Sequence, residues 1–270
     1  MERFAKYEGL GNDFVVLDAR EWPASAVTPD LARRLCDRHT GIGGDGVLWV
    51  DPGTGRMVIY NADGSRPEMC GNGVRCVAAW LADQGLLDVG GTVVVHSDAG
   101  PRPATVLARD PTGRNGARVA VDMGVAVVGK TVDARPAEGD PVAVDVVDLG
   151  NPHGVVFAPC RDPEAVVRAV AALAEFPRGV NVELVSPAGT GFRVRVHERG
   201  VGWTQACGTG ACAVAAAAVA RGLAAAGAPV AVTLDGGDLE VVIAPDTGRV
   251  RMTGPARRVF EGTVSGVGRA

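Results

Sequence analysis

The chain lacks the features of several common protein classes. Its 270 residues carry a net charge of only −4 at neutral pH and contain no run of basic residues, which argues against a nucleic acid as partner. The N-terminus lacks the long apolar stretch of a secretory signal, and the best apolar run, residues 211–220, is far too short to cross a membrane. We therefore expect a cytoplasmic protein that binds neither nucleic acid nor membrane.

Lysine is scarce, since Lys6 and Lys130 are the only two. Pyridoxal phosphate needs a lysine for its Schiff base, and neither lysine lies in a glycine-rich or catalytic-looking context. No glycine-rich nucleotide fingerprint follows a strand with the required acidic partner. The sequence therefore predicts no cofactor.

The six cysteines include no Cys-x-x-Cys pair, and a chain of this size does not need disulfides, so we expect free thiols. Thiolates can bind zinc, but the cysteine spacing and the lack of matched histidine pairs predict no metal site. A buried free cysteine usually behaves as a small hydrophobic residue. We expect that role for Cys36, Cys76, Cys160 and Cys212.

The other two cysteines open similar segments, Cys70-Gly71-Asn72-Gly73 and Cys207-Gly208-Thr209-Gly210, which lie 137 residues apart. Each segment leads into a run rich in alanine and valine that predicts a helix. At a helix N-terminus, backbone N–H groups and the helix dipole favour an anion, either a thiolate or a bound carboxylate. We therefore interpret the two cysteines as a proton-transferring pair, one a thiolate base and the other a thiol acid on the opposite face of a substrate.

Other landmarks recur in the same order at offsets of 137 to 139 residues. Asn12 is matched by Asn151, and both Asn61 and Glu198 lie nine residues before a cysteine of the pair. Repetition on this scale indicates that one structural unit has been used twice. We infer two homologous halves related by a pseudo-twofold axis.

The loop at 109–116 is the expected boundary between the halves. It gives an N-terminal half of residues 1–116, to which residues 257–270 return, and a C-terminal half of residues 117–256. Few helices alternate with many short strands, which predicts an α+β fold in which each half is a curled β-sheet or barrel around a central helix. The expected helices span 29–39, 74–84, 163–176 and 211–223.

Several segments together resemble the diaminopimelate epimerase family, within the wider group of two-cysteine, cofactor-independent amino-acid racemases. The matching segments follow one another along nearly the whole chain: 9–14, 38–43, 61–65, 69–76, 151–153, 180–182 and 198–210. The resemblance implies a homodimeric isomerase that interconverts LL- and meso-2,6-diaminopimelate in the biosynthesis of lysine and peptidoglycan precursors. Phe260 lies near a position that resembles the family's dimer contact.

The resemblance also implies a role for each matched position. Cys70 matches the proton donor and Cys207 the proton acceptor for one direction, and the roles exchange in reverse. His153 and Glu198 match polar positions that support catalysis. Positions whose backbone holds the reacting carboxylate are matched by Gly71, Asn72, Gly208 and Thr209. Positions that bind the rest of the substrate are matched by Asn12, Asn61, Asn151, Asn181, Glu198 and Arg199.

Side-chain chemistry agrees with these roles. A second amino-acid head group needs a cation for its carboxylate, which Arg199 supplies, and acceptors for its ammonium, which Glu198 and the asparagines supply. The alternatives are that the asparagines are turn residues, that Glu198 and Arg199 are a solvated surface pair, and that His153 is structural. Asp45 and Asp63 fit turn architecture better than chemistry.

Two residues depart from the family pattern. Trp203 stands where the motif usually continues with a glutamate, and Gly46 stands where many members have a glutamine that touches substrate. These changes leave room for an epimerase of another amino acid, such as proline, hydroxyproline or a basic amino acid. A third hypothesis is a non-enzymatic protein that binds metal or carries reactive thiols.

Overall fold

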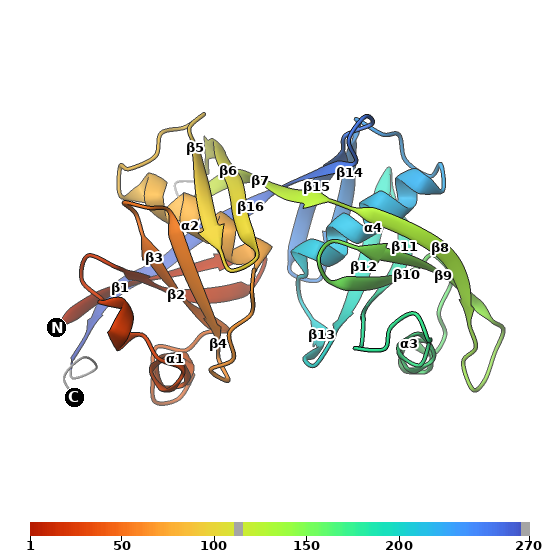
Figure 1. Ribbon diagram of the computed structural model, residues 1–270, viewed down its shortest axis with the longest axis horizontal. Helices are drawn as coiled ribbons and strands as arrows, with labels where there is room; N and C mark the ends of the chain where they lie inside the picture. The colour runs from red at the N-terminus through yellow and green to blue at the C-terminus, as the bar shows by residue number, and fades with distance from the viewer. Residues whose placement is uncertain (111–115, 266–270) are drawn as a thin grey trace. The chain divides into compact units, whose positions relative to one another are not determined.

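The computed structural model describes residues 1–110 and 116–265, and it divides the chain into two compact units (Figure 1). Unit 1 comprises residues 1–121 and 253–270, and unit 2 comprises residues 122–252. Residues 111–115 of the loop expected as the boundary lie outside the described residues. The division itself falls within the strand that follows this loop.

Unit 1 is built on eight strands whose order closes on itself. The strands are β1 (Glu2–Gly9), β2 (Asn12–Asp18), β3 (Gly46–Asp51), β4 (Arg56–Asn61), β5 (Thr92–Ser97), β6 (Gly100–Arg109), β7 (Gly116–Val125) and β16 (Arg249–Val264). They follow one another in that order, and β1 pairs with both β2 and β16. The sheet therefore has no free edge in this unit, as in a barrel. Phe260 of β16 is 45% exposed, and its ring packs edge-on against Phe4 with 5.8 Å between centroids.

The interior of unit 1 holds a helix of small residues, α2 (Gly71–Asp83). Nearly every residue of α2 is buried, and the helix contacts β1, β2, β3, β5 and β6. Glycine and alanine make the helix thin enough for strands to surround it, and a Cβ at Gly73 would lie only 3.1 Å from Leu48 of β3. Helix and strands are thus fixed by close packing.

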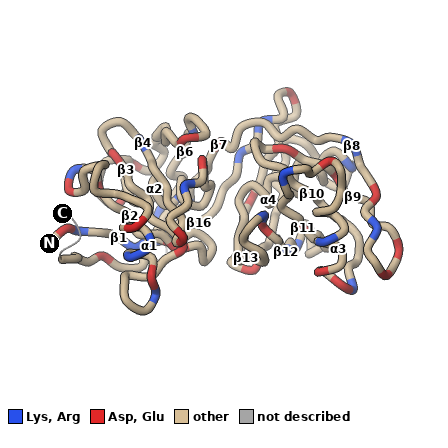
Figure 2. Tube along the Cα trace, turned by 60° about the horizontal axis from the view of Figure 1, so that its bottom comes forward, with Lys and Arg blue, Asp and Glu red and all other residues tan. Residues whose placement is uncertain are grey.

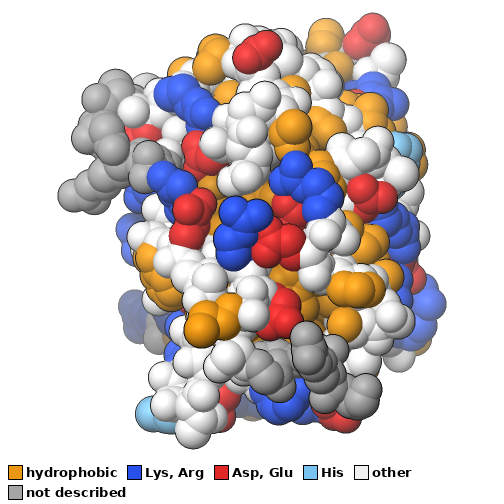
Figure 3. All heavy atoms as spheres, turned by 90° about the vertical axis from the view of Figure 1, so that its left-hand side faces the viewer, with side chains coloured by type: hydrophobic (Ala, Val, Ile, Leu, Met, Phe, Trp, Pro, Cys, Tyr) orange, Lys and Arg blue, Asp and Glu red, His pale blue; other side chains and the backbone are white. Residues whose placement is uncertain are grey.

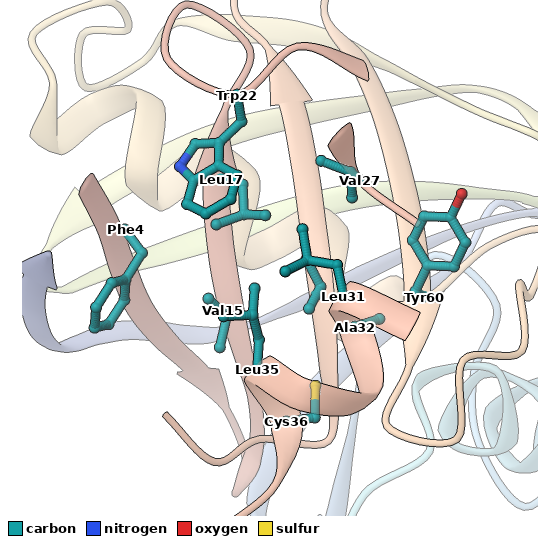
Figure 4. Close-up of a cluster of buried hydrophobic side chains, with 11 residues drawn as sticks. Phe4, Val15, Leu17, Trp22, Val27, Leu31, Ala32, Leu35, Cys36 and Tyr60 are labelled. Atoms are coloured by element: carbon teal, nitrogen blue, oxygen red, sulfur yellow. The ribbon is translucent and has the colours of Figure 1, made fainter. Parts of the chain in front are cut away.

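A second helix of unit 1, α1 (Pro29–Cys36), packs its apolar face on the sheet (Figure 4). The Thr28 hydroxyl caps it by accepting a hydrogen bond from the Leu31 amide at 3.2 Å, and Pro29 suits its first turn. The short 3₁₀ turn η1 (Ala24–Ala26) precedes α1. The buried cluster between α1 and the sheet consists of Phe4, Val15, Leu17, Trp22, Val27, Leu31, Ala32, Leu35, Cys36, Val47 and Tyr60.

Unit 2 repeats the architecture with its own strands and helices. The strands are β8 (Val127–Ala134), β9 (Val142–Asp148), β10 (Pro152–Val156), β11 (Asn181–Ala188), β12 (Gly191–Glu198), β13 (Gly202–Thr204), β14 (Pro229–Leu234) and β15 (Gly237–Ile243). The helices are α3 (Pro163–Ala171) and α4 (Gly208–Ala220). The buried helix α4 contacts β8, β9, β10, β11, β14 and β15.

The pairing pattern shows that the two units are copies. In unit 1 the parallel pairs are β2–β3, joined through α1, and β4–β5, joined through α2. In unit 2 the parallel pairs are β10–β11, joined through α3, and β12–β14, joined through α4. All other pairs of known direction are antiparallel. The predicted α+β class, with a curled sheet around a central helix in each unit, is confirmed.

The predicted helices exist, but α2 and α4 each begin three residues before the expected start. Among the residues that the structure describes, no helix combines the length and the apolar character needed to cross a membrane. Charges of both signs are interspersed along the trace of each unit (Figure 2). On the face drawn in Figure 3, basic side chains lie beside acidic ones.

Candidate active site

Cys70 lies at the N-terminus of α2, where its sulfur takes the place of a capping hydroxyl. The Gly73 amide donates to Cys70 Sγ at 3.5 Å, and the thiol lies 3.8 Å from Asn12 Oδ1. Asn72 Nδ2 donates to the same oxygen at 3.1 Å. We call Cys70, Asn12, Asn72 and Gly71 the Cys70 cluster, and the structure brings these four predicted residues together at one end of the helix.

Asp45 holds the Cys70 cluster in place. Its Oδ2 accepts from Asn12 Nδ2 at 2.8 Å and from the Asp13 amide at 3.1 Å. These bonds turn the Asn12 carbonyl oxygen toward Cys70 and Asn72. The sequence indicated only a turn at Asp45, so its contact with Asn12 was missed.

A charged network fixes the turn that carries Asp45. Lys6 is 4% exposed, and its ammonium contacts Asp13 Oδ2 at 2.6 Å and the Gly43 carbonyl. Arg38 Nη2 bridges Asp13 Oδ1 at 2.6 Å and Asp45 Oδ1 at 2.9 Å. Burial by itself would raise the pKa of Asp13, but hydrogen bonds and charges from Arg38 and Lys6 lower it to about 2.

Asn61 and Gly46 face each other across the pairing of β3 with β4. Asn61 Nδ2 donates to Ser65 Oγ at 2.9 Å. A Cβ at Gly46 would lie 2.6 Å from the Tyr60 carbonyl oxygen. Glycine at position 46 is therefore a packing requirement of this chain.

Cys207 occupies the matching position at the N-terminus of α4 in unit 2. The Gly210 amide donates to Cys207 Sγ at 3.4 Å, and Thr209 Oγ1 lies 3.4 Å from the same sulfur. The residue is 6% exposed. Burial, and then the charges of Glu198 and Glu183, raise the pKa of the Cys207 thiol well above its ordinary value, while the bonds from Thr209 and Gly210 act in the opposite direction.

His153 and Asn151 join Cys207 in a second set of contacts. Asn151 Nδ2 donates to Thr209 Oγ1 at 3.3 Å, and Asn151 Oδ1 lies 3.2 Å from His153 Nε2. We call Cys207, Gly208, Thr209, Asn151 and His153 the Cys207 cluster.

Glu183 is a buried acidic residue that sequence reasoning missed. Its Oε1 lies 2.7 Å from His153 Nδ1, and both side chains are fully buried. The signal was present, because Glu183 follows Val182 and precedes Leu184 in an apolar strand where a charged residue is unusual.

Asn181, Glu198 and Arg199 form a separate group beside the Cys207 cluster. Asn181 Oδ1 accepts from the Arg199 amide at 3.0 Å, and Asn181 Nδ2 donates to the Pro152 carbonyl at 3.2 Å. Glu198 Oε1 accepts from the Thr204 hydroxyl at 2.6 Å. The Arg199 side chain is exposed and donates to the Arg178 carbonyl at 3.1 Å.

Trp203 is bound by neighbours within unit 2. Its indole nitrogen donates to Glu164 Oε1 at 2.7 Å, the Arg195 guanidinium lies 4.4 Å above its ring, and His197 packs edge-on at 5.3 Å. The side chain thus ties α3 to the strands β12 and β13.

The other cysteines are free thiols within the hydrophobic interior or beside it. Cys36, Cys76 and Cys212 are buried, and Cys160 packs against the core cluster of unit 2. Within the described ranges, no group of three or more His, Cys, Asp or Glu side chains is placed to hold a metal ion.

Solved structures with this fold include isomerases that act on amino acids. A predicted epimerase from Pseudomonas aeruginosa superposes with a TM-score of 0.75 at 22% identity, covering 98% of this chain and 100% of that one. A hydroxyproline epimerase from Agrobacterium vitis superposes with a TM-score of 0.68 at 17% identity, covering 97% and 90%. At these identities the likeness establishes the fold alone.

Sequence comparison narrows the class to one family. The family model for diaminopimelate epimerase matches residues 4–129 and 146–259. The diaminopimelate epimerase of a Synechococcus strain is 41% identical, with 97% of this chain and 98% of that protein covered. The one from a Synechocystis strain is 41% identical, with 96% and 97% covered. The chain belongs to the diaminopimelate epimerase family, as the sequence motifs predicted.

Proposed function

We propose that the protein interconverts LL- and meso-2,6-diaminopimelate by moving the α-proton between two thiols. Cys207 removes the proton from the LL form, and Cys70 returns one to the opposite face of the same carbon. The roles exchange in the reverse direction. The family membership supports the reaction.

One observation carries the two-thiol mechanism. Each unit places one cysteine at the N-terminus of its buried central helix, and in both cases the sulfur accepts a hydrogen bond from the third amide of that helix. The first amides of a helix have no partner within the helix, so Gly71 and Asn72, or Gly208 and Thr209, are suited to hold the α-carboxylate next to the thiol. The same groups stabilise the charge that develops as the α-carbon loses its proton.

The electrostatics of Cys207 explain why ionisation would await substrate. Burial, and then the charge of the nearby Glu198, keep this residue a thiol when no cation is close. The α-ammonium of an amino acid brings a positive charge into that environment and favours the thiolate. The Cys207 thiolate would then form next to the α-proton that it removes.

The distal amino-acid group would be bound by side chains outside the two thiol clusters. Arg199 is exposed and can pair with a carboxylate through its planar guanidinium, while Glu198 can accept from the distal ammonium. Asn61 and Asn181 offer further amide groups outside the clusters, and Asn12 and Asn151 offer them from within the clusters. This arrangement favours a substrate with two amino-acid heads over proline or hydroxyproline.

The decisive experiment follows the α-hydrogen of LL-diaminopimelate by NMR in deuterated water. The wild-type protein should exchange the α-hydrogen and form the meso isomer, whereas Cys70→Ala and Cys207→Ala should abolish inversion. Cys36→Ala, which alters a cysteine of the outer core cluster, is the matched control and should stay active. Inversion by either site variant would contradict the two-thiol mechanism. Exchange of the α-hydrogen of proline but not of diaminopimelate would contradict the proposed substrate.

A further inference from the structure

Glu183 and His153 form a buried pair behind Cys207. His153 lies on β10 and Glu183 on the adjacent strand β11, and neither side chain has any exposed surface. Glu183 Oε1 contacts His153 Nδ1, whereas Oε2 has no hydrogen-bond partner among the described residues. A buried carboxylate with an unsatisfied oxygen is costly, so this environment favours the protonated acid. Burial raises the pKa of Glu183 accordingly, and His153 offsets this effect only in part.

A chain of four hydrogen-bonding contacts leads from Glu183 through His153 to the sulfur. They run from Glu183 Oε1 to His153 Nδ1 at 2.7 Å, and from His153 Nε2 to Asn151 Oδ1 at 3.2 Å. They continue from Asn151 Nδ2 to Thr209 Oγ1 at 3.3 Å and from Thr209 Oγ1 to Cys207 Sγ at 3.4 Å. All five residues belong to unit 2.

The direction of this chain depends on a proton at His153 Nε2. Asn151 Oδ1 can only accept, so His153 Nε2 must carry a hydrogen to bond with it. Asn151 then donates to Thr209, which leaves the Thr209 hydroxyl hydrogen free to donate to the sulfur. Every donor thus points toward Cys207, and a chain of this direction stabilises the thiolate.

Glu183 determines whether His153 Nε2 carries that hydrogen. With one proton between Glu183 Oε1 and His153 Nδ1, the pair is neutral overall, and the second histidine hydrogen lies on Nε2 wherever the shared proton resides. If the pair loses this proton, an ionised Glu183 retains the Nδ1 hydrogen and leaves a lone pair at Nε2. That lone pair would face the Asn151 oxygen, so the chain of donors would be broken.

Gly210 allows Glu183 to lie this close to the helix terminus. A Cβ at Gly210 would be 2.7 Å from Glu183 Oε1 and 3.4 Å from Cys207 Sγ. Three charged or titratable groups surround Glu183: His153 on β10, Glu198 on β12 and Cys207 at the start of α4. An ionised glutamate near the sulfur disfavours the thiolate by charge repulsion. A neutral Glu183 adds no such charge, and this is a second way in which it favours the thiolate.

We propose that Glu183 is a positioning residue that fixes the tautomer of His153 and so directs, through Asn151 and Thr209, a hydroxyl donor at Cys207 Sγ. This inference deepens the proposed function, because it rests on Cys207 acting as a base. Glu183 acts on the sulfur through these three residues.

The first test measures the histidine tautomer without any substrate. In protein labelled with ¹⁵N-histidine, long-range ¹H–¹⁵N spectra distinguish a protonated Nε2 from a bare one, and the signal of His153 is assigned by its loss in His153→Asn. Wild type and Glu183→Gln should both show hydrogen on Nε2 at neutral pH, because the amide of Gln can donate to Nδ1. Glu183→Met should show a mixture of tautomers. A bare Nε2 in the wild-type protein would overturn the proposal.

The second test measures kcat and KM across pH. Glu183→Gln should keep kcat within about threefold of wild type, and Glu183→Met should lower kcat by about tenfold or more with little change in KM, since a bond that supports a charged group is lost. Because Gln cannot lose the proton that Glu183 can, the alkaline decline of kcat should move to higher pH in Glu183→Gln. Equal kcat values and pH profiles in wild type, Glu183→Gln and Glu183→Met would refute the role.

A matched control separates positioning from general destabilisation. Asp145 is another buried acid of unit 2, and its Oδ1 accepts from Arg221 at 2.9 Å. Asp145→Asn should lose stability and keep the wild-type pH profile of kcat. If Glu183→Met does not fold, Thr209→Val, which deletes the last donor, should lower kcat while Thr209→Ser preserves it. Wild-type protein that fails to exchange the α-hydrogen would sink the proposed function, but the tautomer measurement would still decide the role of Glu183.

Discussion

Replacing Asp13 by asparagine should make the free energy of unfolding change much less with pH in the acid range. Asp13 accepts from Lys6 and Arg38, and these partners hold its pKa at about 2 in the folded chain. An unperturbed aspartate has a pKa of about 3.9, and the difference corresponds to about 2.6 kcal/mol of folding free energy. A carboxyl whose pKa is lower in the folded chain than in the unfolded chain stabilises the fold at pH values above its unfolded pKa. This stabilisation is lost as the pH falls through its folded pKa. Wild type should therefore lose about 2 kcal/mol from this residue between about pH 5 and pH 2.

The variant should be less stable than wild type near neutral pH for a different reason. Asp13→Asn leaves the buried Lys6 ammonium without its carboxylate, and breaking such a pair costs about 3–5 kcal/mol. The difference in unfolding free energy between the two proteins should then narrow by about 2 kcal/mol from pH 6 to pH 2, because only wild type titrates at this position.

Urea unfolding followed by circular dichroism at several pH values measures this difference directly. Asp235→Asn, at an exposed pair with Arg193, is the matched control and should follow wild type at every pH. A constant difference between Asp13→Asn and wild type across the acid range would refute the reasoning. Asp13→Asn should also lower kcat, since Lys6 and Asp13 fix the turn that presents Asp45 to Asn12.

Two further predictions concern positions 46 and 199. Gly46→Ala should lower the free energy of unfolding by about 1–3 kcal/mol, because its Cβ would lie 2.6 Å from the Tyr60 carbonyl oxygen; a thermal unfolding curve like that of wild type would show that the strands yield without cost. Arg199→Gln should raise KM for diaminopimelate by about tenfold or more while changing kcat less, since a charged hydrogen bond to the distal carboxylate is lost. Initial-rate measurements check this, with Arg195→Gln as control, and an unchanged KM would exclude Arg199 from substrate binding.

The sequence predicted the features that depend on local pattern and repetition. Cysteines followed by glycines at two matched positions indicated the two helix termini, and the repeated landmarks indicated two similar units. These signals work because a capped helix start needs particular residues within four positions of the chain. The sequence did not give the true starts of α2 and α4, because glycine in the first turn disfavours a helix by propensity, and a cysteine is not an ordinary cap.

The residues that support the thiols were harder to predict because their partners are distant in sequence. Asp45 meets Asn12 across 33 positions, and Glu183 meets His153 across 30. Only the register of β10 with β11 puts His153 next to Glu183, and no local pattern encodes that register. The glycine-rich turn around Asp45 has an ordinary structural explanation, so Asp45 did not stand out. A charged residue in the apolar strand around Glu183 is unusual, but that signal does not indicate which residue Glu183 contacts.

The two thiol clusters are supported by different electrostatics, although the helices that carry the cysteines are copies. Asn12 beside Cys70 is held by Asp45, and both Asp45 and its partner Arg38 are exposed to water. Asn151 beside Cys207 is held by the fully buried pair of His153 and Glu183. Ionised groups near water tolerate their charges, whereas a buried pair is stable only when it is neutral overall. Acid therefore weakens the support of the Cys70 cluster, because protonation of Asp13 breaks its pairs with Lys6 and Arg38. Alkali weakens the support of the Cys207 cluster, because the pair of His153 and Glu183 then loses its proton.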